Sequence, residues 1–208
     1  MSLTLVIGNK NYSSWPLRPW LFLKFHGIAF EEIRIPLYRE ASKDQILKFS
    51  PAGKVPVFLD GGLKVWDSLA ILEYLAERFP ETQGWPEDCW RVHWRQKCTQ
   101  VSRRCGMNCR RLPATKQLPE AVHSDIERIG QIWRECRQRY GDKGPWLFGR
   151  FTITDAMYAP VALRIHGYQL QTHPEALNYA ATVLDYPAVR EWIESGQRET
   201  EVIPAFEE

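Results

Sequence analysis

The sequence predicts a small α/β domain followed by an all-helical domain. Over residues 1–80, short apolar runs alternate with helical patterns in the order strand, helix, strand, helix, strand, strand, helix. Residues 81–86 combine polar side chains with Gly84 and Pro86, a composition typical of a linker. Residues 87–208 carry helical apolar spacing in segments separated by Gly and Pro. The chain therefore divides into an α/β domain, a linker and a helical domain.

Hydrophobic period and turn residues predict the bounds of the elements. Short apolar or alternating runs predict strands at 3–7, 30–36, 57–59 and 63–65. The sequence Asp60-Gly61-Gly62 favours a hairpin turn between the last two. Helices of the first domain are expected at 17–26, 43–49 and 67–78. Those of the second domain are expected near 87–111, 119–140, 152–167 and 187–195.

Composition limits the possible partners. The chain has 208 residues and a net charge of +2, and its basic residues are interleaved with acids, so we expect no nucleic-acid partner. No run approaches the roughly 18 apolar residues of a membrane span. The amino terminus lacks the charged start, apolar run and cleavage site of a signal peptide. We therefore expect a cytoplasmic protein without a membrane partner.

Five cysteines, an odd number without paired spacing, predict free thiols in a reducing compartment. Cys98, Cys105 and Cys109 recur at nearly whole helical turns and could share one face of a helix. A metal site would need a fourth ligand, and His93 is spaced to point elsewhere. We expect buried small side chains and no metal.

The first candidate site is the turn Tyr12-Ser13-Ser14-Trp15, where an apolar strand gives way to a helix. Serine is a preferred helix cap, so Ser13 and Ser14 can serve as simple caps. The same exposed N–H groups and positive helix end also stabilise an anion held against a serine hydroxyl. A thiolate is one such anion.

The second candidate site is Lys54-Val55-Pro56, at the head of an apolar strand. Pro56 cannot donate a hydrogen bond to a sheet, so it suits a rigid bend that turns the backbone of Val55 outward. We expect a cis Val55-Pro56 bond, against the alternative of an ordinary loop proline. Lys54 taken alone would be a solvated lysine.

Two further helix starts carry capping residues. Asp67 and Ser68 begin a helix whose apolar positions keep helical spacing, and they form either a plain cap or another anion site. Thr152 and Asp155 fit a capping box before an apolar helix. Their role is expected to be structural, because such a cap satisfies N–H groups that the helix leaves unpaired.

Taken together, the serine turn, the Lys-Val-Pro bend and the Asp-Ser helix start resemble the amino-terminal domain of cytosolic glutathione transferases. The resemblance extends over nearly the whole chain and is nearest to bacterial serine-type members akin to the zeta class. It implies a thioredoxin-like domain followed by a helical bundle. It also implies a homodimer.

The resemblance implies a role for each candidate residue. Val55 would pair with the cysteinyl backbone of glutathione, and Lys54 would meet the glycyl carboxylate. Asp67 would hold the ligand ammonium and Ser68 its γ-glutamyl carboxylate. In serine-type members the hydroxyl five positions before an arginine of the first helix faces the sulfur. That arginine corresponds to Arg18, which selects Ser13 and leaves Ser14 as its competitor.

The activity implied is a glutathione transferase that attacks an apolar electrophilic second substrate with the glutathione thiolate, in detoxification. A glutathione-dependent isomerase of the maleylacetoacetate type is the enzymatic alternative. Trp15 stands where the zeta pattern has a cysteine, which weakens that alternative. A non-catalytic glutathione-binding protein is a third reading. A thiol-disulfide reductase is disfavoured, because no cysteine precedes Asp88.

Overall fold

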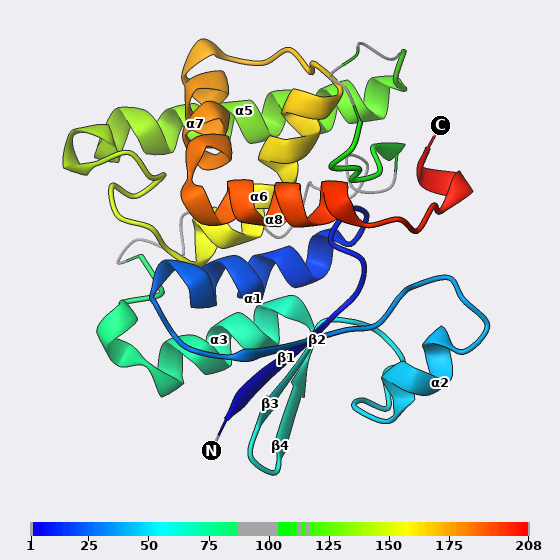
Figure 1. Ribbon diagram of the computed structural model, residues 1–208. Helices are drawn as coiled ribbons and strands as arrows, with labels where there is room; N and C mark the ends of the chain where they lie inside the picture. The colour runs from blue at the N-terminus through cyan, green and yellow to red at the C-terminus, as the bar shows by residue number, and fades with distance from the viewer. Residues whose placement is uncertain (1, 87–103, 112–113, 115–116, 208) are drawn as a thin grey trace.

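A four-stranded mixed sheet in the order β2-β1-β3-β4 forms the centre of the first domain. The computed structural model describes residues 2–86, 104–111, 114 and 117–207. β1 pairs in parallel with β2 and antiparallel with β3, and β3 pairs antiparallel with β4. The strands span Leu3–Ile7 (β1), Glu31–Arg34 (β2), Val57–Asp60 (β3) and Leu63–Trp66 (β4). Figure 1 shows this sheet at the foot of the molecule, below the helices.

Three helices accompany the sheet, and all three were predicted. They are α1 (Ser14–Phe25), α2 (Ser42–Leu47) and α3 (Ser68–Arg78). α1 begins three residues earlier than predicted. Pro16 lies in its first turn, where a missing N–H removes no helical hydrogen bond. The serine pair therefore stands at the very start of α1.

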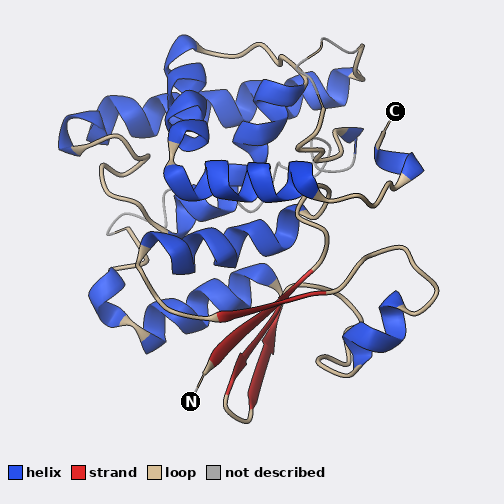
Figure 2. Cartoon of the chain, viewed as in Figure 1, coloured by secondary structure: helices blue, strands red, loops and turns tan. Residues whose placement is uncertain are grey.

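The rest of the described chain is helical, as predicted (Figure 2). Its long helices are α5 (Glu120–Tyr140), α6 (Ile153–Gly167), α7 (Pro174–Asp185) and α8 (Pro187–Arg198). Three short 3-10 turns complete the described elements: η1 (Pro80–Thr82), η3 (Gly141–Lys143) and η4 (Pro204–Phe206). α7 was not predicted, although Pro174 at its start is a standard first helical residue. None of the described helices is long and apolar enough to cross a bilayer.

The helix predicted over 87–111 is wrong at its carboxyl end, and residues 87–103 lie outside the described part of the chain. Residues 105–111 form bends and turns. The N–H of Cys109 donates to the carbonyl of Asn11, at 3.2 Å. The N–H of Arg110 donates to the side-chain oxygens of Asn11 and Asn108. Because the Cys109 N–H bonds to Asn11 and the Arg110 N–H bonds to side-chain oxygens, neither forms a helical hydrogen bond, and Cys105 and Cys109 do not share a helix face.

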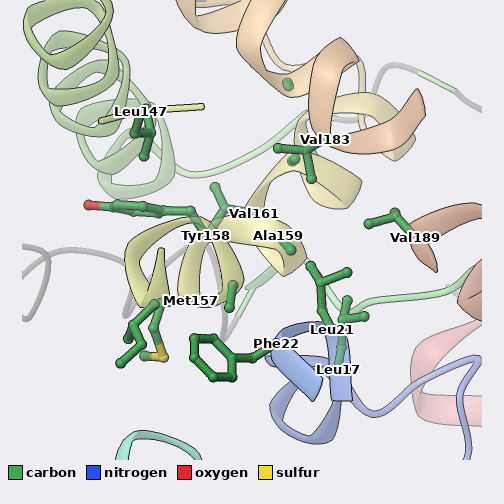
Figure 3. Packing of buried hydrophobic residues seen from close by; sticks show 14 of the residues in the cluster. Leu17, Leu21, Phe22, Leu147, Met157, Tyr158, Ala159, Val161, Val183 and Val189 are labelled. Carbon is green, nitrogen blue, oxygen red and sulfur yellow. The ribbon is translucent and has the colours of Figure 1, made fainter. Parts of the chain in front are cut away.

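α6 joins the two domains by packing on α1. Its side chains are buried on nearly every side, from Ile153 to Ile165. Figure 3 shows Leu17, Leu21 and Phe22 of α1 beside Met157 and Ala159 of α6. Removing each of these leucine, phenylalanine and methionine side chains from water contributes about 1.5–3 kcal/mol. This shared core fixes the start of α1 against the helical domain.

Candidate functional site

A cleft of about 520 Å³ opens where the start of α1 meets α2, the bend before β3 and the 106–107 segment. Four of the predicted site residues line it together: Ser13, Ser14, Lys54 and Val55. The sequence separates the two pairs by about forty positions, and the sheet brings them together because β1 and β3 are neighbours. Asp67 and Ser68 lie outside the lining of this cleft.

The two serines occupy different environments. Ser13 is the N-cap of α1 in extended conformation, yet its side chain makes no capping hydrogen bond. Its hydroxyl therefore remains available to the cleft, next to the positive end of the helix. Ser14 is the first helical residue, and its hydroxyl oxygen accepts a hydrogen bond from Nη2 of Arg164 at 3.1 Å.

The bend before β3 has the predicted geometry. The Val55-Pro56 peptide is cis, and Pro56 is buried while Val55 is half-buried at the wall of the cleft. Among the described residues, no backbone group of Val55 forms a backbone hydrogen bond outside the strands and helices, and β3 begins only at Val57. An extended peptide ligand can pair with such a backbone edge.

Asp67 and Ser68 form the start of α3. Asp67 has a positive φ of 75° and caps the helix, its Oδ1 accepting from the N–H of Leu69 at 2.9 Å and of Ala70 at 3.4 Å. Ser68 is buried, and its hydroxyl accepts from Nη1 of Arg18 at 3.4 Å. Asp67 therefore acts as an ordinary N-cap of α3.

Arg18 connects that helix start to the cleft. Its guanidinium lies 4.1 Å from the ring centroid of Trp15, and Trp15 lines the cleft. Contacts from Trp15 to Arg18 and from Arg18 to Ser68 therefore connect the cleft with the start of α3.

The cleft is cationic. Arg39, Lys43 and Arg164 line it in addition to Lys54, and none of its described lining residues is Asp or Glu. Sequence reasoning missed these three cations, because isolated basic residues on separate elements give no motif. Their convergence favours an anionic ligand.

One side of the cleft is aromatic and comes partly from the end of the chain. Tyr12, Tyr38 and Phe206 line it, and Met107 also belongs to the lining. The Phe206 ring lies 5.7 Å from the ring of Tyr12 and 5.7 Å from that of Tyr38. This wall was also missed, since nothing in the local sequence brings Phe206 back to the amino terminus.

Polar contacts hold the tail in that position. The Tyr12 hydroxyl contacts both Arg110 and Glu207. The hydrogen bond from Tyr12 lowers the pKa of Glu207, and the hydrogen bond from Asn108 and the charges of Arg110 and Arg111 act in the same direction against burial. Figure 1 shows the carboxyl-terminal turn η4 in red beyond α8.

The capping box of α6 is formed as predicted. The N–H and hydroxyl of Thr152 both donate to Oδ2 of Asp155, at 2.8 and 3.0 Å. Oδ1 accepts from the N–H of Leu147 and the hydroxyl of Tyr179. Burial raises the pKa of Asp155, and these four hydrogen bonds oppose the rise. The box therefore fastens α6 to α7 and to the preceding loop.

The described cysteines are buried thiols. Cys105, Cys109 and Cys136 are buried and are not in disulfides. The pKa values of Cys109 and Cys136 are each raised to about 12, chiefly by burial. Within the part of the chain that the structure describes, no group of three or more His, Cys, Asp or Glu side chains could hold a metal ion. Cys98 and His93 lie outside that part.

Comparison with solved structures finds the same fold throughout. A diazinon-metabolizing glutathione S-transferase of the silkworm Bombyx mori superposes with a TM-score of 0.68 at 16% identity, over 95% of this chain and 98% of that one. A glutathione transferase homolog from a Burkholderia, with bound glutathione, gives 0.65 at 20% identity over 97% and 100%. Identities this low show the fold alone.

Curated relatives match over shorter stretches. "Glutathione S-transferase 1" of Dianthus caryophyllus is 41% identical over 76 residues, 36% of this chain and 34% of that protein. The "Probable maleylacetoacetate isomerase" of Caenorhabditis elegans is 37% identical over 79 residues, 38% and 36%. A zeta-class glutathione S-transferase of Euphorbia esula is 27% identical over 150 residues, 70% and 66%. The chain thus spans about a third of the length of the Dianthus caryophyllus and Caenorhabditis elegans proteins, and just under two thirds of the Euphorbia esula protein.

Family models cover both domains. Residues 12–78 match the glutathione S-transferase N-terminal domain, and residues 119–195 match the glutathione S-transferase C-terminal domain. The two matches together cover more than half of the chain and include the serine turn, the Val55-Pro56 bend and the start of α6. The chain belongs to the glutathione S-transferase family.

Proposed function

We propose that this protein is a glutathione transferase that binds glutathione as its thiolate and adds it to an apolar electrophilic substrate. One observation carries the proposal: an unbonded serine hydroxyl at a helix start and the backbone edge of Val55 line the same cationic cleft. A tripeptide with a thiol and two carboxylates matches this combination. We further propose that the enzyme works in the cytoplasm, in detoxification.

The proposed ligand follows the cleft from Val55 toward α3. The cysteinyl backbone pairs with Val55, and the glycyl carboxylate meets Lys54, which is exposed at the rim. The γ-glutamyl end passes Trp15 to Ser68 and Asp67. Both capping hydrogen bonds of Asp67 go to Oδ1, which leaves Oδ2 open to an ammonium group.

In the proposed chemistry, Ser13 donates a hydrogen bond to the sulfur and the start of α1 adds its partial positive charge. Donors to the charged form lower the thiol pKa from about 8.5 toward neutrality. The sulfur then forms a bond to the electrophilic carbon of the second substrate, and the displaced group leaves with its electron pair. The aromatic wall of Tyr12, Tyr38 and Phe206 would hold that apolar substrate.

Substitution of each serine tests the assignment. Ser13→Ala should raise the pKa of the bound thiol and slow conjugation, while Ser14→Ala should do less. The thiolate is measured by its ultraviolet absorbance as pH is varied. If both variants turn over at the wild-type rate, the serine assignment is wrong. If calorimetry detects no glutathione binding to the wild type, the proposed function is wrong.

An isomerase of the maleylacetoacetate type is the second candidate, favoured by the relatives from Caenorhabditis elegans and Euphorbia esula. It would use the same thiolate for reversible addition to a cis-enone. Parallel assays with a cis-enone and a halogenated aromatic separate the two activities. Turnover of neither, despite glutathione binding, would favour a non-catalytic glutathione-binding protein.

We propose that the functional unit is a homodimer. Two large apolar side chains of β4 are exposed, Leu63 at 47% and Trp66 at 44%, on an edge strand of the sheet. Such surface suits a partner copy. Analytical ultracentrifugation of the wild type and of Trp66→Glu tests this, and a monomeric wild type would contradict it.

A further inference from the structure

Arg164 is a buried arginine at the junction of the two domains. Only 3% of it is exposed. Its Nε donates to the carbonyl of Cys105 at 2.7 Å, and its Nη1 to the carbonyl of Pro160 at 3.0 Å. Its Nη2 reaches Ser14, 150 positions away, at 3.1 Å. One guanidinium thus holds the 105–111 segment, α6 and the start of α1 together.

The same group is part of the wall of the cleft. Arg164 lines it beside Ser13 and Ser14. A hydrogen bond accepted by a hydroxyl oxygen strengthens that hydroxyl as a donor. Because Arg164 occupies an acceptor position of Ser14, the proton of Ser14 must point away from the guanidinium. The arginine therefore fixes how the second serine is presented.

Charge gives Arg164 a second effect on the cleft. It belongs to the last turn of α6, where unpaired carbonyls carry partial negative charge. Such a helix end would by itself repel an anion bound nearby. The guanidinium opposes that charge, and a buried charge is screened less by salt and water than an exposed one. An arginine also stays protonated throughout the working pH range.

We propose that Arg164 is a positioning residue for the bound thiolate: it orients Ser14 and supplies a fixed positive charge on the helical-domain side of the sulfur. This inference rests on the proposed function and adds a residue outside the amino-terminal glutathione motifs. It assigns thiolate stabilisation to both domains, with α1 on one side and α6 on the other. The two domains must then be joined correctly for the sulfur to ionise.

Other titratable groups also line the cleft, and the Arg164 variants leave these residues unchanged. Those that line it are Tyr12, Tyr38, Arg39, Lys43 and Lys54. Around Arg164 itself, Cys105 supplies its carbonyl, and the Tyr168 hydroxyl donates to Gly106. Arg111 lies over the ring of Tyr168. Any pH effect of changing Arg164 must therefore be read from the bound thiol itself.

Three variants separate charge from packing. Arg164→Met removes the charge and the donors, Arg164→Lys keeps the charge, and Arg164→Gln keeps an amide donor without charge. Arg150→Met is the control for loss of an arginine elsewhere: Arg150 is exposed, donates to the backbone carbonyls of Gln83 and Trp85, and does not line the cleft. Circular dichroism establishes that each variant is folded.

Two readouts are compared for each protein. The first is the pKa of the bound glutathione thiol, from ultraviolet absorbance. The second is calorimetric affinity for S-methylglutathione, whose thioether cannot ionise. We expect Arg164→Met and Arg164→Gln to raise the thiol pKa by about 1 unit, Arg164→Lys to restore most of the shift, and S-methylglutathione affinity to stay unchanged. A purely structural role would weaken both ligands alike.

The pH profile of kcat should move upward with the thiol pKa in the two neutral variants, while KM for glutathione measured above that pKa stays constant. A folded Arg164→Gln or Arg164→Met protein with the wild-type thiol pKa would overturn the inference and leave the proposed function standing. If wild type binds neither glutathione nor S-methylglutathione, the proposed function itself fails. The glutamine variant supplies the answer if the methionine variant does not fold.

Discussion

The carboxylate of Glu199 accepts a hydrogen bond from the backbone N–H of Asn11 at 3.1 Å, although 188 positions separate the two residues. Its other oxygen accepts from the N–H of Lys10 at 2.7 Å. Both donors belong to the loop that leads from β1 to the serine pair. The residue just after α8 thus holds the loop on which Ser13 depends.

We predict that Glu199→Ala destabilises the protein and weakens glutathione binding. The side chain is 7% exposed, and its loss leaves two backbone donors without their partner, which costs about 1–3 kcal/mol. Urea unfolding and calorimetric titration measure the two effects. Glu194→Ala, on the exposed surface of α8, should change neither. A Glu199→Ala protein with unaltered affinity would show that the loop is held without this carboxylate.

The capping box of α6 should be the most sensitive polar site in the helical domain. Asp155→Ala leaves four buried donors without an acceptor, so we expect a loss of at least about 3 kcal/mol in the free energy of unfolding. Thr152→Ser keeps the hydroxyl and should lose far less. Chemical denaturation of both variants checks this, and equal losses would contradict the role assigned to Asp155.

His26 should make stability depend on pH. Burial lowers its pKa below 6.5, with Glu81 opposing the effect, and its Nε2 is buried without a hydrogen-bond partner among the described residues. The unfolded chain therefore binds the proton more tightly. The contribution of neutral His26 to stability is complete above pH 6.5 and is lost as pH falls through the folded-state pKa.

The measurement compares wild type with His26→Gln. Between about pH 7.5 and about pH 5.5, the urea midpoint of the wild type should fall further than that of the variant. Other groups that titrate in this range contribute equally to both proteins. An identical fall in the two would mean that His26 is not the group responsible.

The buried thiols should be unreactive in the native protein. With pKa values of about 12, Cys109 and Cys136 hold almost no thiolate at neutral pH, and burial also blocks access. Iodoacetamide followed by peptide mapping should label both only after unfolding in urea. Rapid native labelling of Cys136 would indicate that α5 opens locally.

Local sequence was sufficient for the features whose physical cause lies within a few residues. The cis Val55-Pro56 bend and the Thr152–Asp155 box were predicted, and a cap at Asp67 was one of two alternatives, because each is specified by a proline or by a polar side chain next to a helix start. The domain boundaries at 80 and 86 and the chemical roles of the site residues remain predictions. α7 was missed, and the helix predicted over residues 105–111 was wrong because backbone donors of that segment bond to Asn11 instead.

By itself the sequence determined the fold class and most of the elements, because hydrophobic period and capping chemistry act over short distances, and its three motifs carried the resemblance to the family. Only the tertiary structure decided which groups meet at the cleft. Arg164 reaches Ser14 from α6, and Phe206 returns to Tyr12 from the end of the chain. Such contacts arise when separate helices bury their apolar faces together, and no short sequence pattern encodes where the polar ends of those helices then fall.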